Sequence, residues 1–218
     1  MMNFDLNSVD YILETTRSVR KRLDLTRPVD RGLVMRCIEI ALQAPTGSNR
    51  QGWKWLVLTD ADKKAKIGEY YKESWYTYAG VAARSAPGEE PSAQMKRVIS
   101  SARYLADHMG EVPMMVFPCV EGRAGDASPA ANAGLYGSII PAAWSLMLAL
   151  RARGIGAAWT TLHLSYEKEC NEILGIPAGI TTAALLPVAY FTGDTFKKAD
   201  RVPAGELTYW DSWGETER

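Results

Sequence analysis

Arg17-Ser18-Val19-Arg20 is the first of two stretches that decide how this chain folds, and the second is Ala44-Pro45-Thr46-Gly47-Ser48-Asn49-Arg50-Gln51-Gly52-Trp53. The first stretch places two guanidinium groups and a hydroxyl close together, a set of donors that matches the oxygens of a phosphate. The second ends an apolar helical run with a proline and continues with small residues and amides. Such a loop lets backbone approach a flat polar ring while the side-chain amides bind its edge. Together the two stretches predict a phosphorylated, planar cofactor.

The composition is that of an ordinary soluble protein. The chain has 218 residues, of which 47% are hydrophobic and 23% charged, enough for one domain or a compact pair with a sizeable core. Lys plus Arg and Asp plus Glu number 25 each, so the formal net charge is zero. The chain has no excess of basic residues of the kind that nucleic-acid-binding proteins carry, and we expect no nucleic-acid partner.

The cysteines are expected to be buried structural thiols. Cys37, Cys119 and Cys170 are odd in number, widely separated and set in apolar or helical contexts. Neither they nor the two histidines have the spacing of a metal site, so no metal is expected. The N-terminal residues lack a basic region followed by an apolar core, which argues against a signal peptide. These features favour a reducing cytoplasm.

One uncharged run, Ala133 to Leu150, reaches the lower limit of membrane-spanning length. Alanine, glycine and serine dilute its apolar content, and Pro141 interrupts it. We therefore expect a helix buried in the core or at an oligomer interface, and no membrane partner.

Helices and strands alternate irregularly along the chain. Apolar periodicity predicts helices over about 8–20, 31–44, 60–78, 92–109, 133–153 and 165–174. Strands are predicted over about 53–59, 112–120, 157–162 and 181–191. Pro113 and Pro118 indicate strand ends or an edge position for the second strand. The pattern predicts an α+β domain with a small central sheet.

Two later segments complete a recognisable set: Gly154-Ile155-Gly156-Ala157-Ala158-Trp159-Thr160-Thr161, and Leu186-Pro187-Val188-Ala189-Tyr190 followed by the basic residue Arg201. With the first two stretches, and in the same order, they resemble the nitroreductase-like flavoprotein family from about Tyr11 to Trp213. The resemblance implies a single FMN-binding domain over residues 1–218, with a small mixed or antiparallel sheet surrounded by helices. It also implies an intertwined homodimer with two flavin sites at the interface.

The resemblance assigns roles to individual residues. The FMN phosphate and ribityl chain would be held by Arg17, Ser18, Val19 and Arg20, with Arg201 completing the phosphate site. A loop reaching the flavin from the partner subunit would consist of Pro45, Thr46, Gly47, Ser48, Asn49 and Gln51. The flavin N5–O4 edge would lie near Thr160, Thr161 and Leu162, with either threonine as the catalytic group.

Each of these residue types also has an ordinary interpretation. The arginines could form a solvated helix end, Asn49 and Gln51 could be turn residues, and the two threonines could simply favour a strand. By strand alternation one threonine faces the core and the other the site, and the sequence does not say which. His163 is expected to have a structural role rather than to serve as an acid.

The activity implied by the resemblance is that of an FMN-dependent NAD(P)H oxidoreductase. Electron-poor acceptors such as nitroaromatics and quinones would be reduced by a ping-pong hydride mechanism, with a small-molecule acceptor as the partner. Alternatives are a reductive dehalogenase, a flavin-fragmenting enzyme, a non-catalytic flavin-storage protein, or a deazaflavin in place of FMN. NADH and NADPH are not distinguished, because the chain has no Gly-x-Gly-x-x-Gly motif.

Two peripheral regions have expected roles. Residues 70–110 begin with an aromatic stretch and are interpreted as a lid over the flavin, or alternatively as a helix pair packed on the core. The polar tail over residues 193–218 carries Tyr209, Trp210 and Trp213. Aromatic side chains in a polar tail are expected to dock on a partner subunit.

Overall fold

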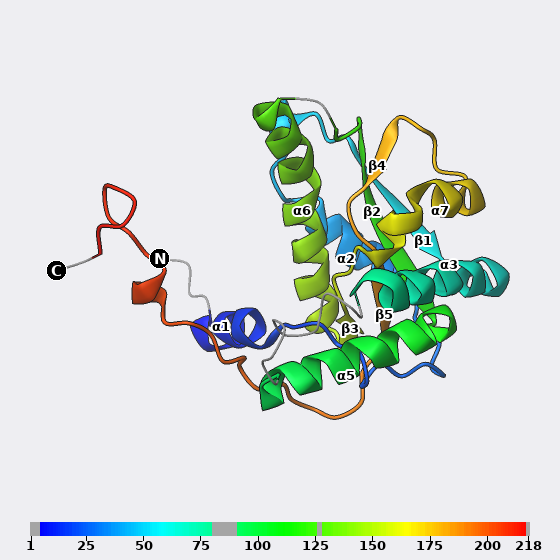
Figure 1. The fold of residues 1–218 in the computed structure, drawn as a ribbon, viewed down its shortest axis with the longest axis horizontal. Helices are drawn as coiled ribbons and strands as arrows, with labels where there is room; N and C mark the ends of the chain where they lie inside the picture. Colours follow the sequence, from blue (N-terminus) through cyan, green and yellow to red (C-terminus); the bar gives the residue numbers. More distant parts are fainter. Residues whose placement is uncertain (1–4, 80–90, 126–127, 217–218) are drawn as a thin grey trace. The chain divides into compact units, whose positions relative to one another are not determined.

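The computed structural model describes residues 5–79, 91–125 and 128–216 (Figure 1). Two compact units are present: one comprises residues 17–193, and the other comprises residues 1–16 together with residues 194–218. The larger unit is an antiparallel sheet with helices packed on it, so the predicted α+β class is confirmed.

The sheet has the strand order β1-β2-β5-β3, and β4 also pairs with β2. The strands are β1 (Trp53–Leu58), β2 (Met114–Glu121), β3 (Ile155–Ala157), β4 (Ile180–Thr182) and β5 (Leu186–Tyr190). All pairs are antiparallel, with Trp55 opposite Pro118, Met115 opposite Pro187 and Ile155 opposite Tyr190. The single strand predicted over residues 181–191 is therefore two strands, which pair with different parts of β2.

The edge position predicted from the prolines is wrong for Pro118, although Pro113 does lie just before β2 as expected. β2 is central, because β1 lies on one side and both β4 and β5 lie on the other. The carbonyl of Pro118 accepts from Ala183 N at 2.8 Å, on the β4/β5 side. In an extended strand the nitrogen of a residue points to the same side as its carbonyl. The position where Pro118 lacks an N–H therefore faces the connection between β4 and β5. No hydrogen bond between β2 and β1 is lost.

Each face of β2 is covered by helices. On one face Met114 and Val116 belong to a cluster with buried side chains of α2 (Arg31–Ala41) and α6 (Pro129–Arg151). On the other face Phe117 contacts the ring of His163 in the 3₁₀ turn η4 (Leu162–Tyr166). That side also carries α3 (Ala61–Ser74), α5 (Ala93–His108) and α7 (Glu167–Leu174), as Figure 1 shows.

Local sequence explains where these helices begin and end. Four helices begin at a residue whose side chain accepts from the backbone N–H three positions on, namely Asp30, Asp60, Ser92 and Ser128. The chain turns after α6 at Gly154 (φ +74°) and after α7 at Gly175 (φ +69°), a conformation that glycine adopts without strain.

α6 is long and apolar enough to cross a membrane, judged by length and composition alone, with a mean hydropathy of 1.5. Within its most apolar window 39% of the residues are buried inside the chain. Ile140 and Trp144 are 42% and 40% exposed. The helix is therefore a core element with one outward apolar face.

The smaller unit contains α1 (Leu6–Thr15), a 3₁₀ turn η5 (Ala204–Glu206) and an ion pair between Glu14 and Lys198. α1 ends five residues before the predicted limit at Arg20, because Thr16 has an extended backbone (φ −68°, ψ 128°). The apolar side chains of α1 are largely exposed. In the C-terminal part of the same unit Trp213 is 92% exposed.

Buried polar groups occupy the core beside the helices. The three cysteines are free and buried, as predicted, and burial raises the pKa of each thiol. The imidazole of His163 is 2% exposed, and neither ring nitrogen has a hydrogen-bond partner among the described residues. Burial lowers its pKa to about 4, so His163 is neutral at pH 7. This supports the structural role expected for His163.

Acid should therefore destabilise the fold through His163. The unfolded chain binds a proton near pH 6.5 and the folded chain only near pH 4, so the free energy of unfolding falls as the pH drops through this interval. The total loss is on the order of 3 kcal/mol. Urea unfolding of wild type and His163→Leu at several pH values should show a flatter dependence in the variant.

The matched control for this measurement is His108→Gln, which also removes an imidazole but at a partly exposed position. Any flattening that is specific to the buried imidazole should be absent from this control. Equal slopes for His163→Leu and wild type would contradict the assignment of the acid sensitivity to the buried imidazole.

Candidate functional site

The segment Arg17–Arg20 lies along the edge of β3. Val19 N donates to Ala157 O at 2.9 Å, and the Val19 side chain is 3% exposed. Val19 thus acts as the anchor of the stretch, and the polar residues on either side of it are held against the sheet.

This contact is possible because residue 156 is glycine. A Cβ added to Gly156 would lie 2.9 Å from Val19 Cβ and 3.1 Å from both of its Cγ atoms. Such a distance is shorter than carbon atoms tolerate, and a valine has no flexible end that could move aside. The glycine of the third sequence motif therefore has a packing reason: it admits the basic segment to the sheet edge.

Arg20 is the half-buried cation of this segment, whereas Arg17 is exposed and Ser18 is half-buried. The Arg20 guanidinium donates to Ser101 Oγ on α5 at 3.4 Å, and burial lowers its pKa. Among the described residues no carboxylate pairs with Arg20. A partly desolvated cation without a counter-ion is unfavourable, and an anionic ligand would compensate it.

Thr160 and Thr161 lie in different environments. Thr160 forms a single β-bridge with Leu185, and its Oγ1 donates to the hydroxyl of Tyr71 at 2.9 Å. Thr161 is exposed, and Leu162 begins η4. The strand predicted over residues 157–162 is thus wrong beyond Ala157. Strand alternation does not decide which threonine faces the site; the Tyr71 contact fixes the direction of the Thr160 side chain.

Tyr71 is the residue whose position the sequence did not reveal. It lies on α3 and is 4% exposed. Its pKa is raised by burial, against the opposing effects of the Thr160 hydrogen bond and the charge of Arg20. The only available signal was its place in an aromatic stretch, which gave no partner. Arg20, Tyr71 and Thr160 thus form one cluster from three separate parts of the chain.

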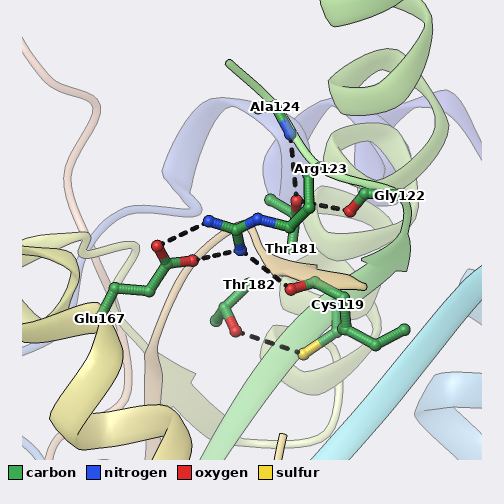
Figure 2. Close-up of polar contacts among 8 residues, drawn as sticks. Cys119, Gly122, Arg123, Ala124, Glu167, Thr181 and Thr182 are labelled. Carbon is green, nitrogen blue, oxygen red and sulfur yellow. Dashed lines mark hydrogen bonds and ion pairs between the residues drawn. The ribbon is translucent and has the colours of Figure 1, made fainter. Parts of the chain in front are cut away.

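The end of the η4 turn next to α7 is held by hydrogen bonds on two sides. Ser165 Oγ accepts from Ser74 Oγ of α3 at 2.9 Å. On the other side Arg123 donates to both oxygens of Glu167, at 2.6 and 2.8 Å, and to Ile180 O at 3.0 Å (Figure 2). The Arg123 hydrogen bonds lower the pKa of Glu167. These contacts tie η4 and α7 to both α3 and the sheet.

The loop from Pro45 to Gln51 is exposed apart from Thr46 and has a strained backbone. Ser48, Asn49 and Gln51 all have φ between 51° and 53°, a left-handed conformation that non-glycine residues adopt at some cost. The loop is held by Gly47 N, which donates to Ser138 Oγ of α6 at 3.0 Å. Within the loop Gln51 N donates to Thr46 Oγ1 and Gln51 Nε2 to Asn49 Oδ1.

The loop and the Arg20 cluster are not brought together within one chain. The loop contacts α6 at Ser138, whereas β3 follows the opposite end of α6 after Arg151. The rise of an α-helix separates these two positions by about 20 Å along the axis, and Figure 1 shows the same arrangement. Arg201 belongs to the smaller unit, where it is exposed and its guanidinium donates to Asp200 O.

Comparison with known proteins identifies the class. The sequence profile of the Nitroreductase family matches residues 13–190. The chain belongs to this family.

Individual relatives are distant but cover nearly the whole chain. A protein of Thermus thermophilus named NADH dehydrogenase is 24% identical over 217 residues, spanning 91% of this chain and 97% of the relative. A nitroreductase with bound FMN from Desulfitobacterium hafniense DCB-2 has a TM-score of 0.65 at 19% identity, with 97% and 100% of the two chains covered. The FMN- and NADPH-dependent nitroreductase NfnB of Sphigopyxis sp. strain HMH has a TM-score of 0.64 at 21% identity, with 93% and 98% covered.

The packing of Val19 on Gly156 can be tested with Gly156→Ala. The added methyl group must displace Val19, which should lower stability by about 1–3 kcal/mol. It should also weaken binding of FMN, the cofactor expected from the sequence, because Arg20 moves with Val19. Thermal unfolding and FMN titration by fluorescence measure the two effects.

Gly179→Ala is the control, because nothing lies within 4 Å of a Cβ built at Gly179. It should change neither quantity. If Gly156→Ala binds FMN as tightly as wild type does, then the close approach at Gly156 does not position the basic segment.

Proposed function

We propose that this protein is an FMN-dependent NAD(P)H oxidoreductase that reduces electron-poor acceptors of the nitroaromatic and quinone type. Membership of the Nitroreductase family supports this function. Within the chain the proposal depends on one observation: the half-buried Arg20 guanidinium has hydroxyl neighbours and no carboxylate partner among the described residues. Such a site suits an anionic ligand.

The residues present fit FMN. Its phosphate carries close to two negative charges, which Arg17 and Arg20 would balance, with Ser18 as a further donor. Arg201 would complete the phosphate site. The ring edge would lie against Thr160, Thr161 and Leu162, where the Tyr71 contact already orients one hydroxyl. Bound FMN supplies hydride and electron transfer between a nicotinamide donor and an acceptor.

The chain's own residues would then bind and orient the reactants. The Arg20 charge would favour negative charge on a bound ring, and the contacts of Thr160 with Tyr71 and Leu185 would hold the segment that faces the ring edge. His163 is buried and its pKa is lowered to about 4, so we assign it no role as a proton donor to the acceptor. NAD(P)H and the acceptor would use the same exposed face in turn.

A second copy of the chain would supply the loop. Because the Pro45–Gln51 loop lies at the other end of α6 from Arg20, the loop of one subunit would approach the cluster of its partner. The outward face of α6, with Ile140 and Trp144 exposed, is suited to such a homodimer. It continues into a cavity of about 360 Å³ between α2 and α6, lined in part by Ile40 and Leu148.

The peripheral regions have proposed roles in the same assembly. The apolar side chains of α1 and the tail aromatics at Tyr209, Trp210 and Trp213 would pack on the partner subunit. The proposed lid over residues 70–110 includes residues 80–90, which lie outside the described residues. Within this region Trp75 is buried, whereas Tyr76 is 46% exposed and is the better candidate to contact an acceptor.

Three free, buried cysteines agree with a reducing cytoplasm as the location. The relatives include one named for NADH and one for NADPH, so either nicotinamide is a candidate donor.

No contact in the described residues favours the dehalogenase alternative. The ammonium of Lys72, which could otherwise pair with the carboxylate of a halogenated tyrosine, pairs with Asp107 at 3.4 Å.

The first experiment is an absorption spectrum of the purified protein, followed by anaerobic addition of NADH or NADPH and then of a quinone. We expect a yellow protein that releases FMN on denaturation, bleaches with the donor and recolours with the acceptor. The double variant Arg17→Ala, Arg20→Ala should be mostly flavin-free because the phosphate loses both cations. A bound flavin that does not bleach would indicate storage, and full FMN occupancy in the double variant would contradict the phosphate site.

The shared site predicts that dimerisation and FMN binding are linked. Trp144→Glu places a charge on the outward face of α6, so it should yield a monomer whose FMN affinity is at least tenfold weaker. Light scattering and FMN titration measure both properties. Met95→Glu is the control, because Met95 is also exposed and lies in the first turn of α5, where a carboxylate is tolerated. A monomeric variant with wild-type FMN affinity would contradict the proposal that two subunits share each FMN site.

A further inference from the structure

We propose that Tyr71 is a residue of the cofactor site: Thr160 donates to its buried hydroxyl, and the Tyr71 hydroxyl in turn donates a hydrogen bond to the cofactor ring beside Arg20. The inference rests on the proposed function, because it adds a residue to the same site. Tyr71 would tune how strongly the site favours the reduced ring, and Thr160 would keep the Tyr71 hydroxyl in its orientation.

Tyr71 is held firmly by its surroundings. It lies on α3, 4% exposed, and reaches a threonine 89 residues later in the chain. Ser74, one helical turn further along the same face, binds Ser165 in η4 at 2.9 Å. Two hydrogen bonds thus join one face of α3 to the segment that runs from Thr160 into η4. Because α3 fixes Tyr71, the 2.9 Å contact in turn fixes the rotamer of Thr160.

One of the two hydroxyl protons of the Thr160–Tyr71 pair is not used in the hydrogen bond between them. Each hydroxyl carries a single proton, and one of the two is used in the bond between Thr160 and Tyr71. In the part of the chain that the structure describes, the other proton has no recorded acceptor. Thr160 donates within the pair, so the proton that remains available to a ligand is that of the Tyr71 hydroxyl.

Arg20 lies close enough to influence the Tyr71 hydroxyl, and a guanidinium has donors only. The cluster therefore offers positive charge and hydrogen-bond donors. Only one of the two hydroxyl protons is used within it, in the bond from Thr160 to Tyr71. A ligand that fits it presents acceptor atoms and gains from negative charge. The edge of a flavin ring has this chemistry, and its negative charge increases on reduction, so the donors should stabilise the reduced form more than the oxidised form.

The test separates this role from simple core packing. Tyr71→Phe keeps the buried ring and removes only the hydroxyl, and Thr160→Val removes the other half of the pair. The measurement is the midpoint potential of bound FMN by equilibration with redox dyes, together with the dissociation constant of oxidised FMN. Tyr70→Phe is the matched control, because Tyr70 is the neighbouring tyrosine and packs on Tyr166 with ring centroids 5.0 Å apart.

We expect each single variant to lose about tenfold in preference for reduced over oxidised FMN, which for a two-electron couple is a potential about 30 mV more negative. The double variant should show the same shift as either single variant, because both changes remove one shared interaction. Tyr70→Phe and Thr160→Ser, which keeps the hydroxyl, should retain the wild-type potential. Binding of oxidised FMN should change little.

The possible failures are distinguishable. If wild type binds no FMN, the proposed function itself is wrong. If wild type binds FMN but Tyr71→Phe and Thr160→Val both keep its potential, the proposed role of Tyr71 is overturned and the proposed function stands. Shifts that add in the double variant would also overturn the pairing. Should Tyr71→Phe lose its fold by circular dichroism, the comparison of Thr160→Val with Thr160→Ser decides the question.

Discussion

The constraint on which the fold depends is that β2 is buried on both faces and bonded on both sides. Three of the other four strands pair directly with it, and seven of its eight residues are buried. A strand of this kind needs a helical layer on each face. Met114 and Val116 direct one face to α2 and α6, and Phe117 directs the other to η4. The basic segment is attached to β3, which is joined to β2 only through β5, so β2 organises both layers without contributing a side chain to the site.

The candidate site collects a guanidinium and two hydroxyls, with no carboxylate paired to the guanidinium among the described residues. Arg20 comes from the segment after α1, Tyr71 from α3, and Thr160 from the chain that leaves β3. Each is partly or fully withdrawn from solvent, which strengthens their electrostatic effect on a ligand and makes an unmatched donor costly. The absence of a side chain at Gly156 allows the first of these groups to approach the others. Packing and electrostatics are therefore coupled, since a change in either moves the charge relative to the hydroxyls.

Much of the fold could be predicted from local patterns. The helices that begin after Asp30, Asp60 and Ser92 followed from apolar periodicity, and the structure shows that each of these residues caps its helix with its side chain. Both features depend on neighbours in sequence. The errors occurred where distant contacts prevail. Pro118 suggested an edge, yet its missing N–H falls at the passage from β4 to β5. The β-forming threonines suggested a longer strand, yet the bridge to Leu185 and the start of η4 end it. The helical run toward Arg20 stops at Thr15, and Val19 then bonds to β3.

The sequence by itself determined the chemistry and the family: two arginines near a hydroxyl, an amide-rich loop after Pro45, and small residues before Thr160, all in one order. These are properties of residue type and spacing, which a linear pattern carries in full. Only the tertiary structure decided that Thr160 rather than Thr161 has a buried hydroxyl partner, that this partner is Tyr71, and that the Pro45–Gln51 loop lies away from Arg20 in the same chain. Those facts depend on contacts between residues about ninety positions apart, as with Gly47 and Ser138 or Tyr71 and Thr160. No local periodicity encodes such pairs, because they arise only when the two helical layers close on the sheet.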